Sequence, residues 1–166
     1  SNDTNESSRI YSTSNGGESW DIVGSGPATN IIKGVVYVSS DVGFFCYDYV
    51  EGMDSNLYKT DDGGKTFAKV MLEEQELDSS AANPQGQETE TKTDSGKNGA
   101  DSSEQLRWGD VYKEALTPVV DSTGIITIYL TQGKNAVYND GKTAAKYQSS
   151  DKGSTWKYIG QVEIKD

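Results

Sequence analysis

The chain has 166 residues, with 26 Asp and Glu against 15 Lys and Arg, which gives a formal net charge of −11 at pH 7. It contains no histidine and one cysteine, Cys46. Within this chain, these counts exclude Ser–His–Asp and Cys–His catalysis, histidine-containing zinc sites and intrachain disulfides. The absence of a basic face argues against nucleic acid as a partner.

The predicted elements, taken in chain order, are strands. The polar residues 1–8 predict a disordered tail, and residues 9–23 predict two strands joined by a turn. Residues 30–72 contain β-branched and aromatic runs that predict four strands. Residues 78–105 lack every large apolar side chain and predict a flexible acidic insertion, because burial cannot offset the entropy of ordering them. A structured loop that grips a ligand is the alternative. Residues 107–164 predict four more strands.

The fold class predicted from these elements is all-β, in one domain over residues 9–166. The run 124–130 (GIITIYL) is apolar on both alternations, which is typical of a strand covered on both faces. No stretch shows helical periodicity with caps. No apolar run is long enough to cross a membrane, so no transmembrane segment is predicted.

One eight-residue motif occurs three times, as TSNGGESW at 13–20, TDDGGKTF at 60–67 and SSDKGSTW at 149–156. Its form is Ser/Thr-x-Asp/Asn-x-Gly-x-Ser/Thr-aromatic. The Asp or Asn side chain can accept hydrogen bonds from backbone N–H groups ahead of it, and the glycine supplies a positive φ. The aromatic residue opens the next strand and is expected to be buried under the hairpin. The positions concerned are Thr13, Asn15, Gly17, Trp20, Thr60, Asp62, Gly64, Phe67, Ser149, Asp151, Gly153 and Trp156.

This motif resembles the Asp-box, or bacterial neuraminidase repeat (BNR), with Asn15 for Asp in the first copy and Phe67 for Trp in the second. In that family the box joins the third and fourth strands of a β-propeller blade and lies away from the active centre. Sialidases, other glycoside hydrolases and sortilin-like receptors carry it. The resemblance therefore implies a fold and leaves the function open.

The resemblance implies propeller-type blades of four antiparallel strands. Blades have roughly 40–50 residues, which matches the spacing of the first two motifs and, once 78–105 is counted as an insertion, approaches that of the last two. Residues 9–23 would be a half-blade, and 30–72 and 107–164 would each be a blade. This is a partial propeller of about two and a half blades, too few to close a ring.

Catalytic residues are not identified in this sequence. The sialidases that the chain resembles use three arginines to clamp a carboxylate, whereas this chain has two, Arg9 and Arg107. Another type of glycosidase needs only two well-placed carboxylates, but nothing singles out a pair. The candidates are Asp41, Asp48, Glu51, Asp54, Asp110, Glu114 and Asp121. Calcium binding by Asp61, Asp62 or the acidic run 73–76 is an alternative, but no EF-hand spacing is present, and no metal or cofactor is predicted.

The candidate ligand-binding residues are Trp108, Asp110 and Tyr112, which follow the acidic insertion. An aromatic ring can stack on a sugar while a carboxylate accepts hydrogen bonds from the hydroxyl groups of the sugar. The aromatic run 44–49 is a second lead. For this run and for Trp108, packing in the core between blades is the alternative.

The sequence therefore predicts a non-enzymatic binding or scaffold segment of an exported or cell-surface, extracellular protein, with carbohydrate as one ligand class. The polar N-terminus suits a mature exported protein. The alternatives are a fragment of an Asp-box glycoside hydrolase whose catalytic residues lie elsewhere, or of a sortilin-like receptor propeller with a peptide or protein ligand. The expected partners are a glycan or protein, together with neighbouring blades of a longer chain or a second copy.

Overall fold

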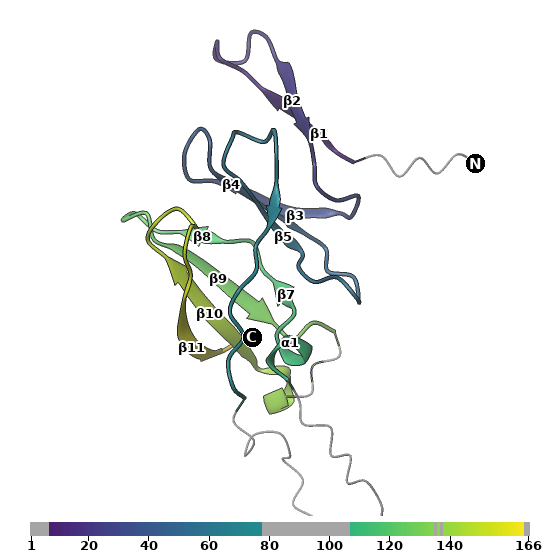
Figure 1. Cartoon of the computed structure of the whole chain (residues 1–166), viewed down its shortest axis with the longest axis vertical. Helices are drawn as coiled ribbons and strands as arrows, with labels where there is room; N and C mark the ends of the chain where they lie inside the picture. Colours follow the sequence, from purple (N-terminus) through teal and green to yellow (C-terminus); the bar gives the residue numbers. More distant parts are fainter. Residues whose placement is uncertain (1–6, 78–106, 135, 137, 165–166) are drawn as a thin grey trace, which may run out of the picture.

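The structure, a computed structural model, describes residues 7–77, 107–134, 136 and 138–164. The predicted insertion at 78–105 and most of the predicted tail lie outside these residues. The described chain is all-β and antiparallel, as predicted, and forms three sheets that follow one another in chain order along the long axis (Figure 1).

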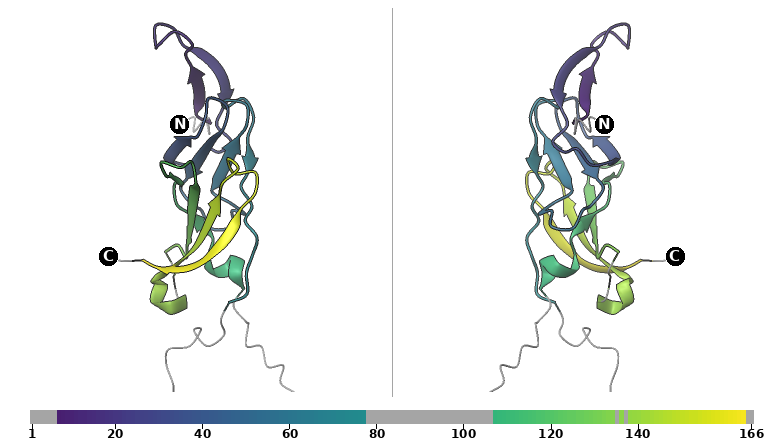
Figure 2. Two further views of the ribbon diagram at one scale, coloured as in Figure 1. Left: turned by 90° about the vertical axis from the view of Figure 1, so that its left-hand side faces the viewer. Right: turned by 90° about the vertical axis from the view of Figure 1, so that its right-hand side faces the viewer.

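The first sheet, which we call the hairpin sheet, pairs β1 (Arg9–Ser12) with β2 (Asp21–Ser25). The middle sheet has the order β3-β4-β5-β6. Its strands are β3 (Ile32–Tyr37), β4 (Gly43–Tyr47), β5 (Leu57–Thr60) and β6 (Ala68–Lys69). The hairpin sheet projects beyond the two larger sheets (Figure 2).

The last sheet has the order β11-β10-β9-β7, and β8 also pairs with β9. Its strands are β7 (Glu114–Ala115), β8 (Val119–Val120), β9 (Ile126–Thr131), β10 (Thr143–Ser149) and β11 (Lys157–Glu163). Four strands were expected in this region and five are present. Pro118, which has no N–H to donate, lies between β7 and β8 and interrupts their pairing with β9.

One short helix, α1 (Trp108–Val111), lies just before β7, although none was expected from the sequence, and the segment η2 (Tyr138–Gly141) lies just before β10. In η2, Asn139 and Asp140 have positive φ (48° and 54°), so this segment is a left-handed turn and not a regular helix. Each has four residues, so neither presents the repeated apolar face from which helices are recognised in sequences.

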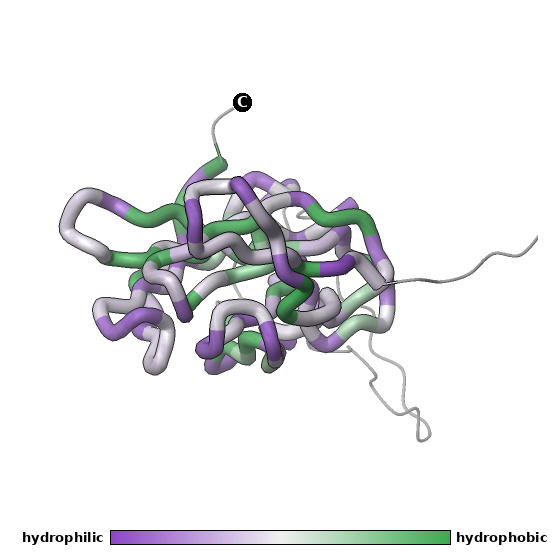
Figure 3. The backbone as a smooth tube through the Cα atoms, turned by 90° about the horizontal axis from the view of Figure 1, so that it is seen from above, coloured by the Kyte–Doolittle hydropathy of each residue, from purple (hydrophilic) through white to green (hydrophobic). Residues whose placement is uncertain are grey.

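The sheets pack face to face through two hydrophobic layers. Phe44 and Cys46 of β4 meet Ile126 and Ile128 of β9 between the middle and last sheets. The opposite face of β4, including Phe45, packs near the hairpin sheet. Hydrophobic stretches of the chain alternate with hydrophilic turns when the molecule is viewed along its long axis (Figure 3).

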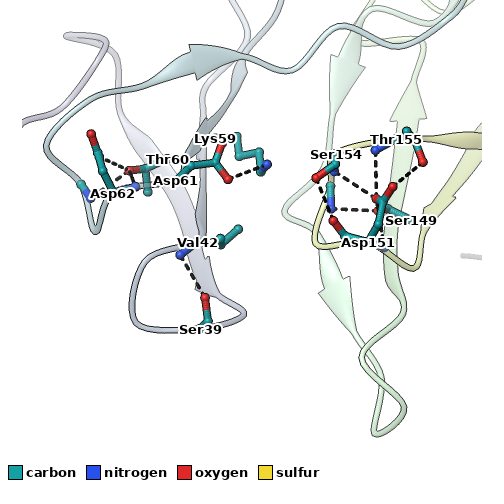
Figure 4. A network of polar contacts seen from close by, with 12 residues as sticks. Ser39, Val42, Lys59, Thr60, Asp61, Asp62, Ser149, Asp151, Ser154 and Thr155 are labelled. Atoms are coloured by element: carbon teal, nitrogen blue, oxygen red, sulfur yellow. Dashed lines mark hydrogen bonds and ion pairs between the residues drawn. The ribbon is translucent and has the colours of Figure 1, made fainter.

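The turns 13–20, 60–67 and 149–156, which we call motifs 1, 2 and 3, form the same hydrogen bonds. In motif 3, the Ser149 hydroxyl accepts the Gly153 N–H (2.8 Å), and Asp151 Oδ1 accepts the Ser154 and Thr155 N–H groups (3.0 and 2.9 Å; Figure 4). Asp62 accepts the corresponding N–H groups in motif 2, at 3.0 and 2.8 Å. The predicted turn chemistry is confirmed at both carboxylates.

Motif 1 repeats this arrangement with an amide in place of the carboxylate. The Gly17 N–H is donated to the Thr13 hydroxyl (2.9 Å), and the Ser19 N–H to Asn15 Oδ1 (3.0 Å). The predicted positive φ is present at Gly17, Gly64 and Gly153. The residue before each of these glycines also has a positive φ, including the non-glycine Lys152 (φ 58°). Each motif is therefore a double left-handed turn.

Burial of the motif aromatics differs from the expectation in one copy. Phe67 and Trp156 are partly buried, with their rings 4.9 Å from Phe45 and 6.0 Å from Phe44 between centroids. Trp20 is 59% exposed, and its indole N–H is donated to the Gly17 carbonyl (3.2 Å). The expected burial is wrong for Trp20, because no sheet covers it among the residues that the structure describes.

The motif carboxylates should contribute to stability only above acidic pH. The hydrogen bond from the Thr66 hydroxyl is the largest of the effects that lower the pKa of Asp62, to about 2, and the Thr155 hydroxyl likewise holds the pKa of Asp151 well below its usual range. Because both pKa values are lower in the folded chain, this contribution is complete above the unfolded pKa of about 4 and is lost as the pH falls towards 2.

Unfolding in urea at a series of pH values would check this expectation. The double variant Asp62→Asn, Asp151→Asn should lose less stability than the wild type between about pH 4 and 2. Asp61→Asn is the matched control, since the Asp61 carboxylate pairs with Lys59 (2.7 Å) and does not belong to the turn pattern. Parallel acid profiles for the wild type and the double variant would contradict the assignment.

Candidate functional site

A cavity of about 430 Å³ opens at the end of the molecule opposite motifs 2 and 3. In the antiparallel middle sheet, the β5–β6 connection carries motif 2, and the β4–β5 connection lies at the other end. The cavity is lined by residues of the β4–β5 connection, by the segment 70–74 after β6, and by α1 with its flanking residues. The cavity is therefore formed by segments that are distant in the sequence.

All three predicted ligand-binding residues, Trp108, Asp110 and Tyr112, line this cavity. The two aromatic residues do not have the exposure that stacking on a sugar requires. Trp108 and Tyr112 are 4% and 2% exposed, and their ring centroids lie 4.7 Å apart. The Tyr112 hydroxyl is 2.8 Å from the Thr143 hydroxyl. The two rings belong to the hydrophobic core around β10 and cannot act as an exposed stacking surface, whereas Asp110 is exposed.

Three further residues supply the accessible apolar wall, and of these only Tyr49 belongs to a segment that the sequence singled out. Tyr49 and Met53 are partly exposed on the β4–β5 connection, and Met71 is 64% exposed after β6. Tyr49 belongs to the aromatic run 44–49, so its alternation with Tyr47 was a usable signal. Nothing in the sequence indicated that the two methionines would lie beside it, because the loops that carry them meet only in the folded chain.

Charged groups of both signs surround the opening. The lining includes the carboxylates of Asp54 and Glu74 and the cationic groups of Arg107 and Lys113. The hydrogen bond from the Lys69 ammonium to Asp54 (2.7 Å) lowers the pKa of Asp54, and the bond from Lys113 to Glu51 (3.0 Å) raises the pKa of Lys113. Such surface pairs orient their side chains but contribute little to stability.

The arrangement suits binding better than catalysis. Carboxylates and cations can hydrogen-bond the hydroxyl groups of a ligand, while Tyr49 and the methionines cover its apolar surface. Among the described residues, no group of three His, Cys, Asp or Glu side chains is placed to hold a metal ion. The Cys46 thiol is buried in the sheet interface, which raises its pKa to about 11, and it does not line the cavity.

Comparisons of the chain with protein-family models, with curated proteins and with solved structures found no match. In the part of the chain that the structure describes, no helix is long and apolar enough to span a membrane.

Proposed function

We propose that this chain is a non-enzymatic, carbohydrate-binding segment of an exported or cell-surface protein of the Asp-box, β-propeller type. The three motifs support the propeller assignment, because motifs 2 and 3 join the third and fourth positions of successive antiparallel sheets. Motif 1 joins the two strands of the hairpin sheet in the same way. Under this proposal, the hairpin sheet is half of a blade.

The cavity opposite the motifs is the observation that carries the binding proposal. It combines a partly exposed ring, Tyr49, with the exposed carboxylates of Asp54 and Asp110. A pyranose has apolar C–H faces and a rim of hydroxyl groups, so a ring with nearby hydrogen-bond acceptors complements it. The volume of about 430 Å³ is within the range of small-molecule sites.

A glycan array followed by calorimetry on the best ligand would test this function. Tyr49→Ala should weaken binding by about tenfold, since loss of ring contact costs on the order of 1–2 kcal/mol. Asp110→Asn should also weaken binding, because it removes a charged acceptor. Asp41→Asn is the matched control, since Asp41 is exposed and its carbonyl binds the Gly63 N–H at the motif end. Absence of binding to any glycan, or equal binding by all three variants, would contradict the proposal.

A second candidate is a fragment of a glycoside hydrolase, which is favoured by the three cavity carboxylates Asp54, Glu74 and Asp110. Two suitably separated carboxylates suffice for that reaction. Release of chromophore from aryl glycosides, abolished in Asp110→Asn and retained in Asp41→Asn, would establish this candidate in place of a purely binding role. A peptide ligand, as in sortilin-like receptors, has no comparable observation in its favour.

A further inference from the structure

The structure has two interfaces between successive sheets, one between the hairpin and middle sheets and one between the middle and last sheets. At each interface, the motif of the sheet that comes later in the chain packs against the sheet that comes before it. In motif 3, Gly153 lies so close to β4 that a Cβ at this position would be 2.5 Å from Phe44 Cζ, and Trp156 packs edge-on against the same ring. In motif 2, a Cβ on Gly64 would be 3.0 Å from Ile10 of the hairpin sheet. Gly24 of β2 also lies directly against the Gly64 carbonyl. The motif is therefore a contact surface between successive sheets.

Motif 1 shares the hydrogen bonds from the Gly17 and Ser19 N–H groups, but no sheet packs against it among the described residues. A Cβ on Gly17, the position equivalent to Gly64 and Gly153, would meet only the Trp20 ring of the same motif, at 3.8 Å. Around it, Tyr11, Trp20 and Ile22 are 50%, 59% and 57% exposed. Three large apolar side chains on one small sheet form the kind of exposed patch that marks an interaction surface.

The strand registers identify the surface that motif 1 should fit. Motif 2 begins at Thr60, which pairs with Gly43 of β4, and motif 3 begins at Ser149, which pairs with Ile126 of β9. Gly43 and Ile126 therefore occupy equivalent positions, and so do the residues that follow them, Phe44 and Thr127. Phe44 is the residue on which motif 3 packs. The outer face of β9 at Thr127 is therefore equivalent to the face of β4 on which a motif already packs.

This outer face has suitable chemistry. Thr127 pairs with Val119 of β8, which is 59% exposed, and Tyr129 follows two residues later, partly exposed on the same face. Lys146 of β10 lies opposite Tyr129 in the register. Its charge complements that of Glu18 in motif 1 and of Asp21, the first residue of β2, which lie on either side of Trp20 in the sequence. The outer face of the last sheet and the surface around motif 1 therefore both offer apolar side chains, and their charges are opposite.

We infer that motif 1 of one copy docks on the outer face of the last sheet of a second copy, at Val119, Thr127 and Tyr129. The contact repeats the packing of motif 3 on Phe44 and joins two different surfaces, head to tail. Such a contact closes into a ring if the rotation permits and otherwise builds an open chain of copies. The inference rests on sheet packing and does not depend on the ligand of the cavity.

Sedimentation velocity on the full chain, from micromolar to millimolar concentration, would test this inference. The wild type should pass from monomer to dimer or larger species. We call motif 1 the head surface and the outer face of the last sheet the tail surface. Trp20→Glu, on the head surface, and Val119→Glu, on the tail surface, should each remain monomeric. An equimolar mixture of the two should associate again, because one intact head and one intact tail remain. Ile31→Glu is the control, since Ile31 is 69% exposed away from both surfaces and should associate like the wild type.

Other results would overturn the inference. A wild type that is monomeric throughout means that a second copy is not the occupant. If Trp20→Glu is monomeric while Val119→Glu still dimerises, the contact is head to head. Failure of the mixture to associate excludes a head-to-tail contact, and loss of association in Ile31→Glu indicates unspecific assembly. Near-ultraviolet circular dichroism on each variant verifies that it is folded, and Trp20→Ser and Val119→Thr replace any variant that is not.

Discussion

Asn56→Ala should destabilise the fold by about 3–4 kcal/mol. Asn56 is 1% exposed and links two sheets. Its Nδ2 donates to the carbonyls of Tyr47 (2.8 Å) and Ala115 (2.9 Å), and its Oδ1 accepts the Ala115 N–H (2.8 Å). Alanine would leave the Ala115 N–H and two carbonyls buried without this partner, and each such group costs free energy.

Urea unfolding at neutral pH would measure this effect from the transition midpoint, provided that the m-value is unchanged. Gln161→Ala is the control, because Gln161 carries the same amide group on an exposed position of β11 and should change stability by less than about 0.5 kcal/mol. A loss below about 1 kcal/mol for Asn56→Ala would mean that the middle and last sheets do not depend on this link.

Gly153→Ala should have the second largest effect, a loss of about 2–4 kcal/mol. Two causes add. Gly153 has φ +77°, where a Cβ is strained, and the new methyl carbon would be 2.5 Å from Phe44 Cζ. Phe44 is fully buried between the two larger sheets and has little room to move. The substitution therefore separates motif 3 from the sheet on which it packs.

The variant Gly124→Ala, just before β9 of the same sheet, separates the backbone strain from the steric contact. Gly124 has φ +85°, but a Cβ there would meet no atom within 4 Å, so this variant carries the backbone strain alone. It should lose about 1 kcal/mol, and the difference between the two variants measures the steric contact with Phe44. Equal losses in urea unfolding would show that motif 3 does not pack tightly against β4.

The local turns were predictable from the sequence because the hydrogen bonds that define them lie within eight residues. Asp62 and Asp151 accept N–H groups three and four residues ahead, and Gly64 and Gly153 have the positive φ expected of them. Alternating β-branched and aromatic residues were sufficient for the class of fold, since strand formation depends on short-range patterns.

The candidate site could be predicted only in part. The aromatic residues after the predicted acidic insertion indicated a segment that lines the cavity, because Trp108, Asp110 and Tyr112 all lie in its wall. Their individual exposure could not be read from the sequence. Trp108 and Tyr112 are buried by β10 and β11, whose residues lie more than 30 positions later in the chain (for example Thr143, at a separation of 31 from Tyr112).

The sequence by itself determined the three turns and the all-β class, whose interactions are local. Only the tertiary structure decided which face of each element is covered. Trp20 and Trp156 occupy the same place in two copies of the motif, yet Trp20 is exposed and Trp156 packs on Phe44. Likewise, Asn56 is a link between sheets only because the fold brings Ala115, 59 positions away, within hydrogen-bonding distance. Burial depends on the neighbours that packing supplies, and a short-range pattern does not contain them.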